Sequence, residues 1–476
     1  MLKAPITNIL ATRYASVKMC GIWSPEGKVR LERELWIAVA KAQAELGLDI
    51  PAEAIAAYER VKDNISIENI DARERALRHD VKARIEEFCG LAGFEHIHKG
   101  MTSRDLTDNV EMLQIRDAMR LIRGKYISVL RHVSGLAARY ADVILAGRTH
   151  NVAAQPTTAG RRIAMFGQEM LVAFRRLEST LEGYALRGIV GAVGTALDQL
   201  TLFGGDTTKV ARLNERIMEH LGFRARLDAL GQVYPRSMDY EVVSALYQLA
   251  SGPASFCRTL RLMAGAELAG EGFKEGQVGS SAMPHKMNSR SCERVCGFLA
   301  ILNGYLNMTA ALCGDQWNEG DVSCSVVRRV ALPDAFFAAD GMIETFLTIC
   351  NEMGINKPVV EQELRRYLPF LATTTILMEA VKRGAGREQA HDAIKRHAVA
   401  VARAMREEGQ RENDLARRLG EDPAIPLSAA EIESLLADAA AFTGAARSQI
   451  EAFRTQVNGL IASDPAAAGY EPENIL

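Results

Sequence analysis

The chain has 476 residues, of which 48% are hydrophobic and 24% are charged, and its formal charge is −2 at neutral pH. This composition is typical of a globular protein with an ample core and about two to four domains. A nearly neutral chain has no overall field that attracts polyanions, so we expect neither a nucleic-acid partner nor a membrane partner.

The first residues, MLKAPITNILATRYAS, lack the basic segment and apolar core of a signal peptide. No uncharged apolar run is long enough to cross a bilayer, so we expect a cytoplasmic protein. The eight cysteines are scattered without a CxxC pair, which favours reduced, mostly buried thiols. His96 and His98 resemble a metal pair, but no third ligand follows at a suitable spacing, and we expect no metal.

Up to about residue 101, apolar residues recur at helical spacing in short segments such as 34–46. Four longer segments then carry apolar residues at alternating steps of three and four, at 115–140, 163–184, 242–263 and 295–309. This spacing predicts long helices with one buried stripe, and four matching stripes predict a bundle. The third helix contains Pro253, where we expect a kink.

Shorter helical segments return after about residue 355. Alternating β-branched runs are rare, so we predict an all-α fold. We expect an N-terminal helical domain (1–102), a central long-helix bundle (103–355) with a polar loop at 275–290, and a C-terminal helical domain (356–476). The final stretch, ASDPAAAGYEPENIL, has no helical period, which favours mobility.

The polar loop contains GSSAMPHKMNS, from Gly279 to Ser289, between two strongly helical segments. Turn-forming residues alone are equally typical of a plain connector. Lys286 and Asn288, however, provide a charge and an amide suited to a bound carboxylate, and small residues would let the loop close over a site.

GSSAMPHKMN resembles the signature of the fumarase/aspartase superfamily, and the whole chain resembles its adenylosuccinate lyase family. The other shared motifs are, in order, RYAS at 13–16, RHD at 78–80, TS at 102–103, RTH at 148–150 and GQVYPR at 231–236. The resemblance implies β-elimination of fumarate from adenylosuccinate, giving AMP, and from the succinyl-aminoimidazole carboxamide ribotide of purine biosynthesis, giving AICAR. It also implies three helical domains, no cofactor, and a homotetramer whose active sites are each shared by three subunits. Long helices with apolar stripes on several faces agree with self-association.

Such an elimination needs a base beside the carboxylate-bearing carbon, donors that stabilise the carbanion, and an acid for the departing nitrogen. The resemblance implies that His150 is the acid and Ser280 the base, and that Lys286 and Glu293 are also catalytic. A serine hydroxyl is a poor base unless its alkoxide is stabilised, and the adjacent Ser281 remains an alternative. A simpler interpretation of His150 is that it caps the helix that follows.

The resemblance further implies a set of substrate contacts, which are Arg13, Tyr14, Arg78, His79, Asp80, Thr102, Ser103, Thr149, Gln232, Asn288, Arg294, Ser325 and Arg329. Some have plainer interpretations, since Thr102 and Ser103 before Asp105 also form a helix N-cap pattern. Residues 78–80 are equally typical of a polar helix face.

Gly320 departs from the family, which typically has arginine there, and the loop reads KMNS in place of KRNP. Loss of one phosphate-binding arginine removes a charge-assisted hydrogen bond worth about 1.5–3 kcal/mol. Arg328 is a candidate replacement, although on a helix it should point away from Arg329. Two other functions remain open: a fumarate-releasing lyase acting on another succinyl adduct, and a non-enzymatic structural relative. Retention of His150 and Lys286 argues against a non-enzymatic structural relative.

Overall fold

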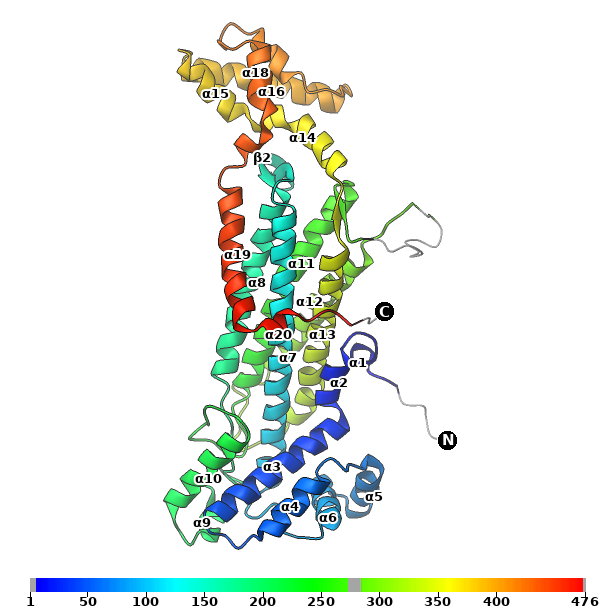
Figure 1. The fold of residues 1–476 in the computed structure, drawn as a ribbon, viewed down its shortest axis with the longest axis vertical. Coiled ribbons are helices and arrows are strands. Elements are labelled where there is room, and N and C mark those ends of the chain that lie inside the picture. The colour runs from blue at the N-terminus through cyan, green and yellow to red at the C-terminus, as the bar shows by residue number, and fades with distance from the viewer. Residues whose placement is uncertain (1–5, 273–282, 284, 474–476) are drawn as a thin grey trace.

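The computed structural model describes residues 6–272, 283 and 285–473, and Figure 1 shows an elongated molecule built almost entirely of helices. The only sheets among these residues are two antiparallel pairs of short strands. The predicted all-α fold is therefore confirmed. None of the described helices combines the length and the apolar character needed to span a membrane.

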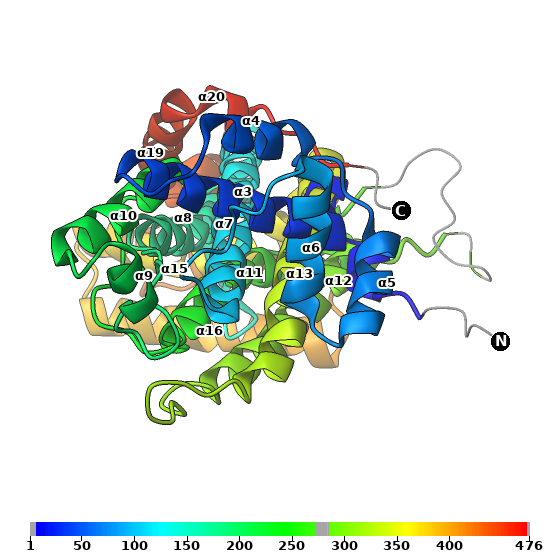
Figure 2. The ribbon, with the colours of Figure 1, turned by 90° about the horizontal axis from the view of Figure 1, so that it is seen from below.

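Six of the described helices precede the bundle; five are short, as the sequence predicted, and the third has 21 residues, longer than the expected segment 34–46. They are α1 (Ile9–Arg13), α2 (Val17–Trp23), α3 (Pro25–Glu45), α4 (Ala52–Val61), α5 (Ile67–Leu77) and α6 (Asp80–Ala92). Serine side chains begin several of them, because each hydroxyl accepts a backbone N–H of the first turn, as Ser16 does for Met19 and Ser24 for Gly27. Helices α3–α6 lie at the lower end of the molecule together with α9 (Leu197–Leu202) and α10 (Thr207–His220) (Figures 1 and 2).

Five long helices run along the molecule. They are α7 (Ser103–Arg139), α8 (Ala159–Glu182), α11 (Ser237–Gly265), α12 (Arg290–Ala310) and α13 (Cys324–Glu352). Helices α7, α8, α11 and α12 confirm the four predicted ones, and Pro253 lies inside α11. The sequence did not predict α13, because every residue from 335 to 347 is buried and no polar face alternates with an apolar one.

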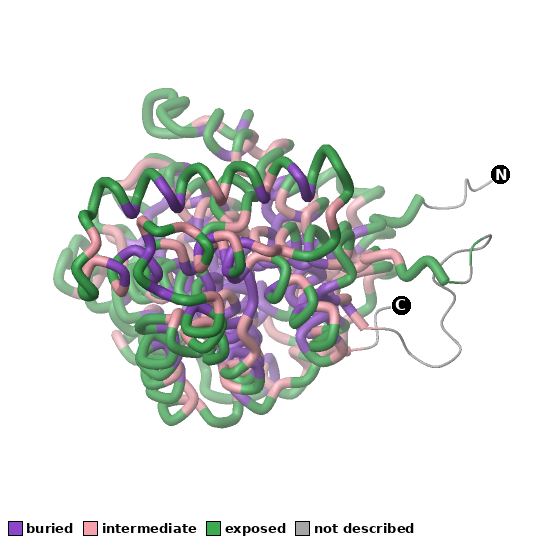
Figure 3. Tube along the Cα trace, turned by 90° about the horizontal axis from the view of Figure 1, so that it is seen from above, coloured by how far each residue is buried: buried purple, intermediate pink, exposed green. Residues whose placement is uncertain are grey.

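The buried residues gather along the centre of the bundle when it is viewed along its length (Figure 3). Aromatic rings link its helices: Phe256 of α11 meets Phe166 of α8 and Phe346 of α13 edge-on, with ring centroids 5.9 and 5.4 Å apart. Burial of each such side chain stabilises the fold by about 1.5–3 kcal/mol.

A β-hairpin that the sequence did not predict joins α7 to α8 at the upper end of the bundle. Its strands β1 (Ile144–Thr149) and β2 (Val152–Thr158) pair antiparallel, with a register shift after Gly147. His150 and Asn151 form the two-residue turn with φ values of 51° and 60°, the left-handed conformation that such tight hairpins need. A second pair, β3 (Ala269–Gly270) and β4 (Gly354–Ile355), ties the end of α11 to the end of α13.

A second hydrophobic core at the upper end is formed by α15 (Thr373–Lys382), α16 (Arg387–Glu407), α17 (Leu415–Gly420) and α18 (Ala429–Ala437). Helix α14 (Lys357–Leu371) leads to this core, and the 3-10 helix η1 (Ala439–Phe442) follows it. The chain then returns along α7 and α8 as α19 (Ala446–Ser463) and ends after α20 (Pro465–Ala468). Contrary to the expected mobility, Tyr470 and Glu473 make hydrogen bonds to Glu344 of α13. The division into three domains remains a prediction.

Candidate active site

The first group of predicted site residues lies at the lower end of the bundle, where α7 begins. The backbone N–H and the hydroxyl of Thr102 donate to Asp105 Oδ2 at 2.8 and 3.2 Å, so the N-cap interpretation holds here. Asp105 Oδ1 accepts hydrogen bonds from Arg187 at 2.7 Å and from the N–H groups of Val190 and Gly191 at 3.0 Å. Asp105 and Arg187 are both fully buried. They fix the loop after α8 against the start of α7.

Arg187 also places Gln232 at this end. Its guanidinium donates to the Gln232 carbonyl at 3.0 and 2.7 Å, and the Gln232 N–H donates to the Glu319 carbonyl at 2.5 Å. A pocket of about 350 Å³ opens beside Gln232 between residues 229–237 and 312–319. The structure thus brings Thr102, Ser103 and Gln232 to the same end of one chain.

Gly320 is packed against Gln232. A Cβ atom at position 320 would lie 2.5 Å from the Gln232 Cβ atom and 2.8 Å from its side-chain oxygen. A larger residue at 320, such as the arginine that the family typically has there, would therefore require Gln232 to move. The glycine fits the local packing.

Arg328 is not available to replace the missing arginine. It is buried in the bundle, where it donates to Asp239 at 2.6 Å, to Glu111 and to the Tyr234 hydroxyl. Burial opposes its charge, but Asp239 and Glu111 raise the pKa of Arg328 well above its usual value. The hypothesis that Arg328 takes over from position 320 is wrong for this arrangement.

Ser325 and Arg329 lie in the first two turns of α13, also at the lower end. Arg329 is exposed and Ser325 is half-buried. The RHD motif forms the junction of α5 and α6: Arg78 ends α5 with φ of 54°, and His79 Nδ1 accepts the Lys82 N–H at 3.3 Å. Asp80 pairs with Arg84 at 3.0 Å; although burial opposes it, Arg84 lowers the pKa of Asp80.

His98 lies between this junction and α7. Burial lowers the pKa of His98, Asp105 opposes that shift, and His79 adds to it. His98 Nδ1 accepts a hydrogen bond from Trp36 Nε1 at 3.0 Å, and His96 Nδ1 lies 3.0 Å from Lys99 Nζ. The two histidines therefore have separate partners.

A second group of predicted residues meets beside α12, at mid-height of the bundle. The Tyr14 ring packs edge-on against Phe298 with centroids 5.2 Å apart, and the Arg294 guanidinium carbon lies 5.6 Å from the centre of the Tyr14 ring. Burial lowers the pKa of Arg294, and the neighbouring Arg13 and Arg290 contribute to this decrease. Arg13, Arg290 and Arg294 thus form a cationic cluster beside the Tyr14 ring, and this cluster can bind an anion.

The loop before α12 holds further predicted residues. Lys286 is exposed, and its N–H donates to the Met283 carbonyl at 3.0 Å; the Asn288 carbonyl accepts the Arg290 N–H at 3.0 Å. Glu293 pairs with Arg261 of α11 at 3.5 Å on the surface of the chain. Ser280 and its alternative Ser281 lie outside the described residues.

The third group occupies the tip of the β-hairpin at the upper end. Thr149 and His150 are exposed there. Arg148 pairs with Glu363 of α14 and lies over the Tyr367 ring at 5.7 Å, which docks the hairpin on α14. His150 does not cap α8, because the Thr158 hydroxyl accepts the Arg161 N–H at 3.1 Å, so that simpler interpretation is wrong.

The three groups are not one site within a single chain. Helix α7 separates Thr102 from the hairpin that carries His150, and its 37 residues span about 55 Å at 1.5 Å per residue. One small substrate cannot contact both residues in the same chain.

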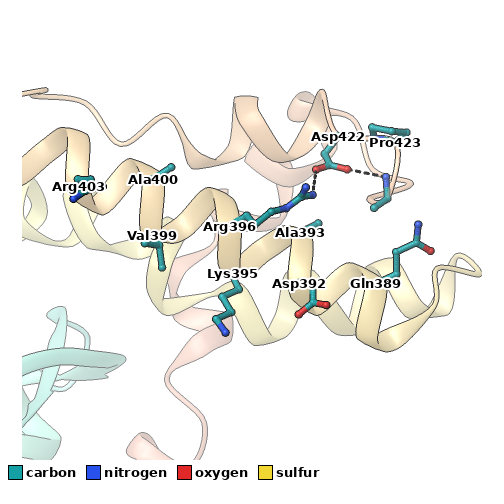
Figure 4. A pocket seen from close by; sticks show the side chains of 11 residues that line it. Gln389, Asp392, Ala393, Lys395, Arg396, Val399, Ala400, Arg403, Asp422 and Pro423 are labelled. Atoms are coloured by element: carbon teal, nitrogen blue, oxygen red, sulfur yellow. Dashed lines mark hydrogen bonds and ion pairs between the residues drawn. The ribbon is translucent and has the colours of Figure 1, made fainter.

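An open groove lies apart from all three groups. It has a volume of about 1170 Å³ and follows one face of α16 and residues 422–424, where Arg396 pairs with Asp422 at 3.0 Å (Figure 4). No predicted site residue lines it.

The sequence did not identify Asp105 and Arg187 as the residues that organise the lower end. They are 82 positions apart, and neither stands in a pattern that pairs them. The only local signal was the N-cap pattern that includes Asp105.

Comparison with known proteins identifies the family. The Lyase family model matches residues 14–303, and the family model for the adenylosuccinate lyase C-terminus matches residues 369–453. The chain is 35% identical to adenylosuccinate lyase of Saccharomyces cerevisiae over 456 residues, 94% of this chain and 93% of that protein. It is 34% identical to adenylosuccinate lyase of Schistosoma mansoni over 474 residues, 98% of this chain and 96% of that protein.

Solved structures share the fold. The 3-carboxy-cis,cis-muconate lactonizing enzyme of Pseudomonas putida superposes with a TM-score of 0.81 at 22% identity, covering 95% of this chain and 99% of that one. The fumarate lyase of Mesorhizobium sp. BNC1 superposes with a TM-score of 0.78 at 21% identity, covering 95% and 100%. The family models and near-full-length relatives together show that the chain belongs to the adenylosuccinate lyase family of the fumarase/aspartase superfamily.

Proposed function

We propose that this chain is a carbon–nitrogen lyase that eliminates fumarate from adenylosuccinate, giving AMP, and from the succinyl-aminoimidazole carboxamide ribotide, giving AICAR. The observation that carries the proposal is its 35% identity to an adenylosuccinate lyase over 94% of the chain. The enzyme would act in cytoplasmic purine biosynthesis, with a nucleotide as its small-molecule substrate and no metal or redox cofactor.

In this mechanism Ser280 removes a proton from the carbon next to a carboxylate, and His150 protonates the departing nitrogen. Thr102, Ser103, Gln232, Lys286 and Asn288 hold the succinyl carboxylates, and their donors stabilise the negative charge of the carbanion. The helix N-terminus at Thr102 supports this role, because free N–H groups and the helix dipole favour an anion.

Two further groups of residues would bind the nucleotide end of the substrate. Arg13, Ser325 and Arg329 would bind the phosphate, and Tyr14 and residues 78–80 the rest of the nucleotide. The cationic cluster of Arg13, Arg290 and Arg294 supports an anionic ligand at mid-height of the bundle.

We propose a homotetramer in which each active site combines residues of three chains. The length of α7 supports this assembly. Because His150 lies too far from the lower end of its own bundle, it can meet Thr102 and Gln232 only if these belong to another copy of the chain. Exposed apolar side chains along the long helices also support it, since such patches mark contact surfaces. They are Met165, Val172, Leu262, Ile301, Val326 and Val330.

Ultraviolet absorbance of released fumarate tests the activity. Wild-type protein should turn over adenylosuccinate, and His150→Gln should reduce kcat by about 10²–10⁴-fold, the usual contribution of a general acid. His391→Gln, an exposed histidine of α16, is the matched control and should leave kcat unchanged. Unchanged kcat in correctly assembled His150→Gln protein would exclude His150 as the acid.

Mixing two inactive variants tests the shared site. His150→Gln and Gln232→Ala carry their lesions at opposite ends of the chain, so random reassembly should restore about a quarter of the sites if these residues come from different subunits. A mixture as inactive as its components would show that both residues must come from the same chain.

The packing at Gly320 favours a second candidate, a lyase of the same superfamily acting on a different succinyl adduct. Gly320 supplies no cation and Arg328 is held by Asp239 and Glu111, so the phosphate end has fewer donors than the family pattern. Turnover of argininosuccinate or aspartate, with none of adenylosuccinate, would establish this second function.

A further inference from the structure

Lys125 is a buried lysine in the middle of α7 that the proposed chemistry does not use. Its ammonium group donates to Asp340 Oδ1 at 2.5 Å, to Glu344 Oε1 at 2.6 Å and to the Ser16 hydroxyl at 2.9 Å. Asp340 and Glu344 of α13 are fully buried, and Lys125 is nearly so. All three donors of the ammonium group are therefore used inside the protein.

Both ends of the described chain attach to this cluster. The Ser16 N–H donates to Asp340 Oδ2 at 2.6 Å. From the other end, the Tyr470 hydroxyl and the Glu473 N–H donate to the two oxygens of Glu344 at 2.5 and 2.7 Å. Figure 1 shows the segment after α20 crossing α7 and α13 towards α1 and α2.

Gly341, one residue after Asp340, lets the N-terminal segment approach α13 closely. A Cβ atom at position 341 would lie 2.7 Å from the Tyr14 Cβ atom and 3.0 Å from the Tyr14 carbonyl oxygen. Glycine is a poor residue for the interior of a helix, but here only glycine leaves room for Tyr14. Asp340, Gly341 and Lys125 thus form a socket, the Lys125 socket, that receives residues 14–16.

The socket leads directly to the predicted nucleotide contacts. Ser16 is held by the socket, Tyr14 rests on Gly341, and the Tyr14 ring lies between Phe298 and Arg294. Arg13 precedes Tyr14 and is close enough to Arg294 to contribute to lowering its pKa. Ser16 is therefore linked to Tyr14 through two peptide units and to Arg13 through three.

We propose that the Lys125 socket is a positioning device that holds Arg13 and Tyr14 in place for the nucleotide end of the substrate. The proposal rests on the proposed function, because it needs Arg13 and Tyr14 to contact the nucleotide. A buried ion pair is an inefficient way to stabilise a bundle, since apolar side chains of similar volume often do as well or better. The directional bonds to Ser16 instead specify where one short segment lies.

Gly341→Ala is the first test, because alanine suits a helix better than glycine while its methyl group displaces Tyr14. KM for adenylosuccinate and Kd for AMP should each rise by about ten- to a hundred-fold, with kcat nearly unchanged, since the lost contacts bind substrate and transition state alike. The matched control is Thr345→Val on the same buried face of α13, whose hydroxyl bonds the Gly341 carbonyl of its own helix. It should leave both constants unchanged.

Ser16→Ala is a milder second test. It removes the hydrogen bond from Lys125 and the weaker N-cap bond from the Met19 N–H, and it should raise KM by about two- to ten-fold. In an Arg13→Ala/Tyr14→Ala background the same substitution should change KM no further, because the residues through which Ser16 acts are gone. A purely structural role would give the same factor in both backgrounds.

These outcomes separate the two proposals. Wild-type protein that fails to turn over adenylosuccinate contradicts the proposed function. If the wild-type protein is active but KM is unchanged in both Gly341→Ala and Ser16→Ala, the positioning role alone is overturned. The same holds if Ser16→Ala raises KM by the same factor in the wild-type and the Arg13→Ala/Tyr14→Ala backgrounds. If the Gly341→Ala protein does not assemble, the comparison of Ser16→Ala in the two backgrounds decides whether the socket has a positioning role.

Discussion

Two buried clusters of charge in this molecule differ in how their charges are balanced. In the lower network four carboxylates meet four guanidinium groups; its members are Arg104, Asp105, Asp108, Glu111, Arg187, Arg236, Asp239 and Arg328. In the mid-bundle cluster one ammonium group, that of Lys125, is shared by Asp340 and Glu344.

One carboxyl group in each cluster has a shifted pKa, and the two shifts are opposite in direction. Burial favours the neutral acid in both, and it raises the pKa of Glu344 although Lys125 opposes the change. At Asp108 burial acts in the same sense, but Arg236 and Arg328 outweigh it and lower the pKa. At these two buried positions the neighbouring cations therefore decide the direction of the pKa shift.

The largest effect on stability should come from the lower network. Asp105→Asn leaves Arg187 buried without its counter-charge and turns an amide NH₂ towards groups that are themselves donors. Since arginine cannot lose its proton, we expect the free energy of unfolding to fall by about 4–5 kcal/mol, measured by urea denaturation. The exposed Asp142→Asn is the control and should stay within about 0.5 kcal/mol of wild type.

The mid-bundle cluster should respond less to loss of its cation. Lys125→Met leaves two buried carboxylates, but these can take up protons, so we expect a loss of about 3 kcal/mol at pH 7 and a smaller one at pH 5. Urea midpoints at both pH values measure this. An equal loss at the two values would contradict the difference between the clusters.

The pH dependence itself provides a third comparison. The pKa of Glu344 is raised above its usual 4.5, so its stabilising contribution is complete below that value and is lost as the pH rises through the folded-state pKa. The pKa of Asp108 is lowered from 3.8, so its contribution is present above that value and is lost as the pH falls through the folded-state pKa.

Glu344→Gln isolates the first of these effects. The difference in unfolding free energy between wild type and Glu344→Gln should shrink as the pH rises from 5 to 7, by at most about 1.4 kcal/mol per pH unit. Parallel profiles for the two proteins would show that Glu344 titrates normally in the folded state.

The smallest effect should come from the exposed hairpin, which lacks a buried charge. Asn151→Ala places a residue with a Cβ at φ of 60° without the asparagine side chain that tolerates it, and should cost about 1 kcal/mol. Asn151→Gly should be neutral or slightly stabilising. Thermal unfolding of the two variants checks the order.

The sequence predicted those elements whose residues alternate between core and surface. The stripes of α8 and α12 were visible because each helix has an exposed face, and those of α7 and α11 because polar or partly exposed residues alternate with the apolar ones. Helix α13 was not visible, because its middle is buried on every side. The hairpin was missed because ILAGRT and VAAQPTT contain glycine, alanine, glutamine and proline, and a bulge breaks their alternation.

The sequence suggested single candidate residues but not their arrangement. Short motifs singled out Arg13, Thr102, His150 and Gln232 as candidates, yet no local pattern tells that His150 and Thr102 stand at opposite ends of α7. The partners that hold these residues are distant in sequence: Arg187 is 82 positions from Asp105, and Asp340 is 324 positions from Ser16. Such pairs form only when helices pack.

The bond between the Val17 N–H and the Glu473 carboxylate at 3.3 Å joins residues 456 positions apart. A chain made from its N-terminus has Ser16 and α7 ready long before Tyr470 leaves the ribosome. Loop closure over such a separation is slow, so this cluster should be among the last parts of the subunit to form. Until then Glu344 lacks the hydrogen bonds that Tyr470 and Glu473 donate to it, so residues 470–473 complete the polar cluster that also holds Ser16.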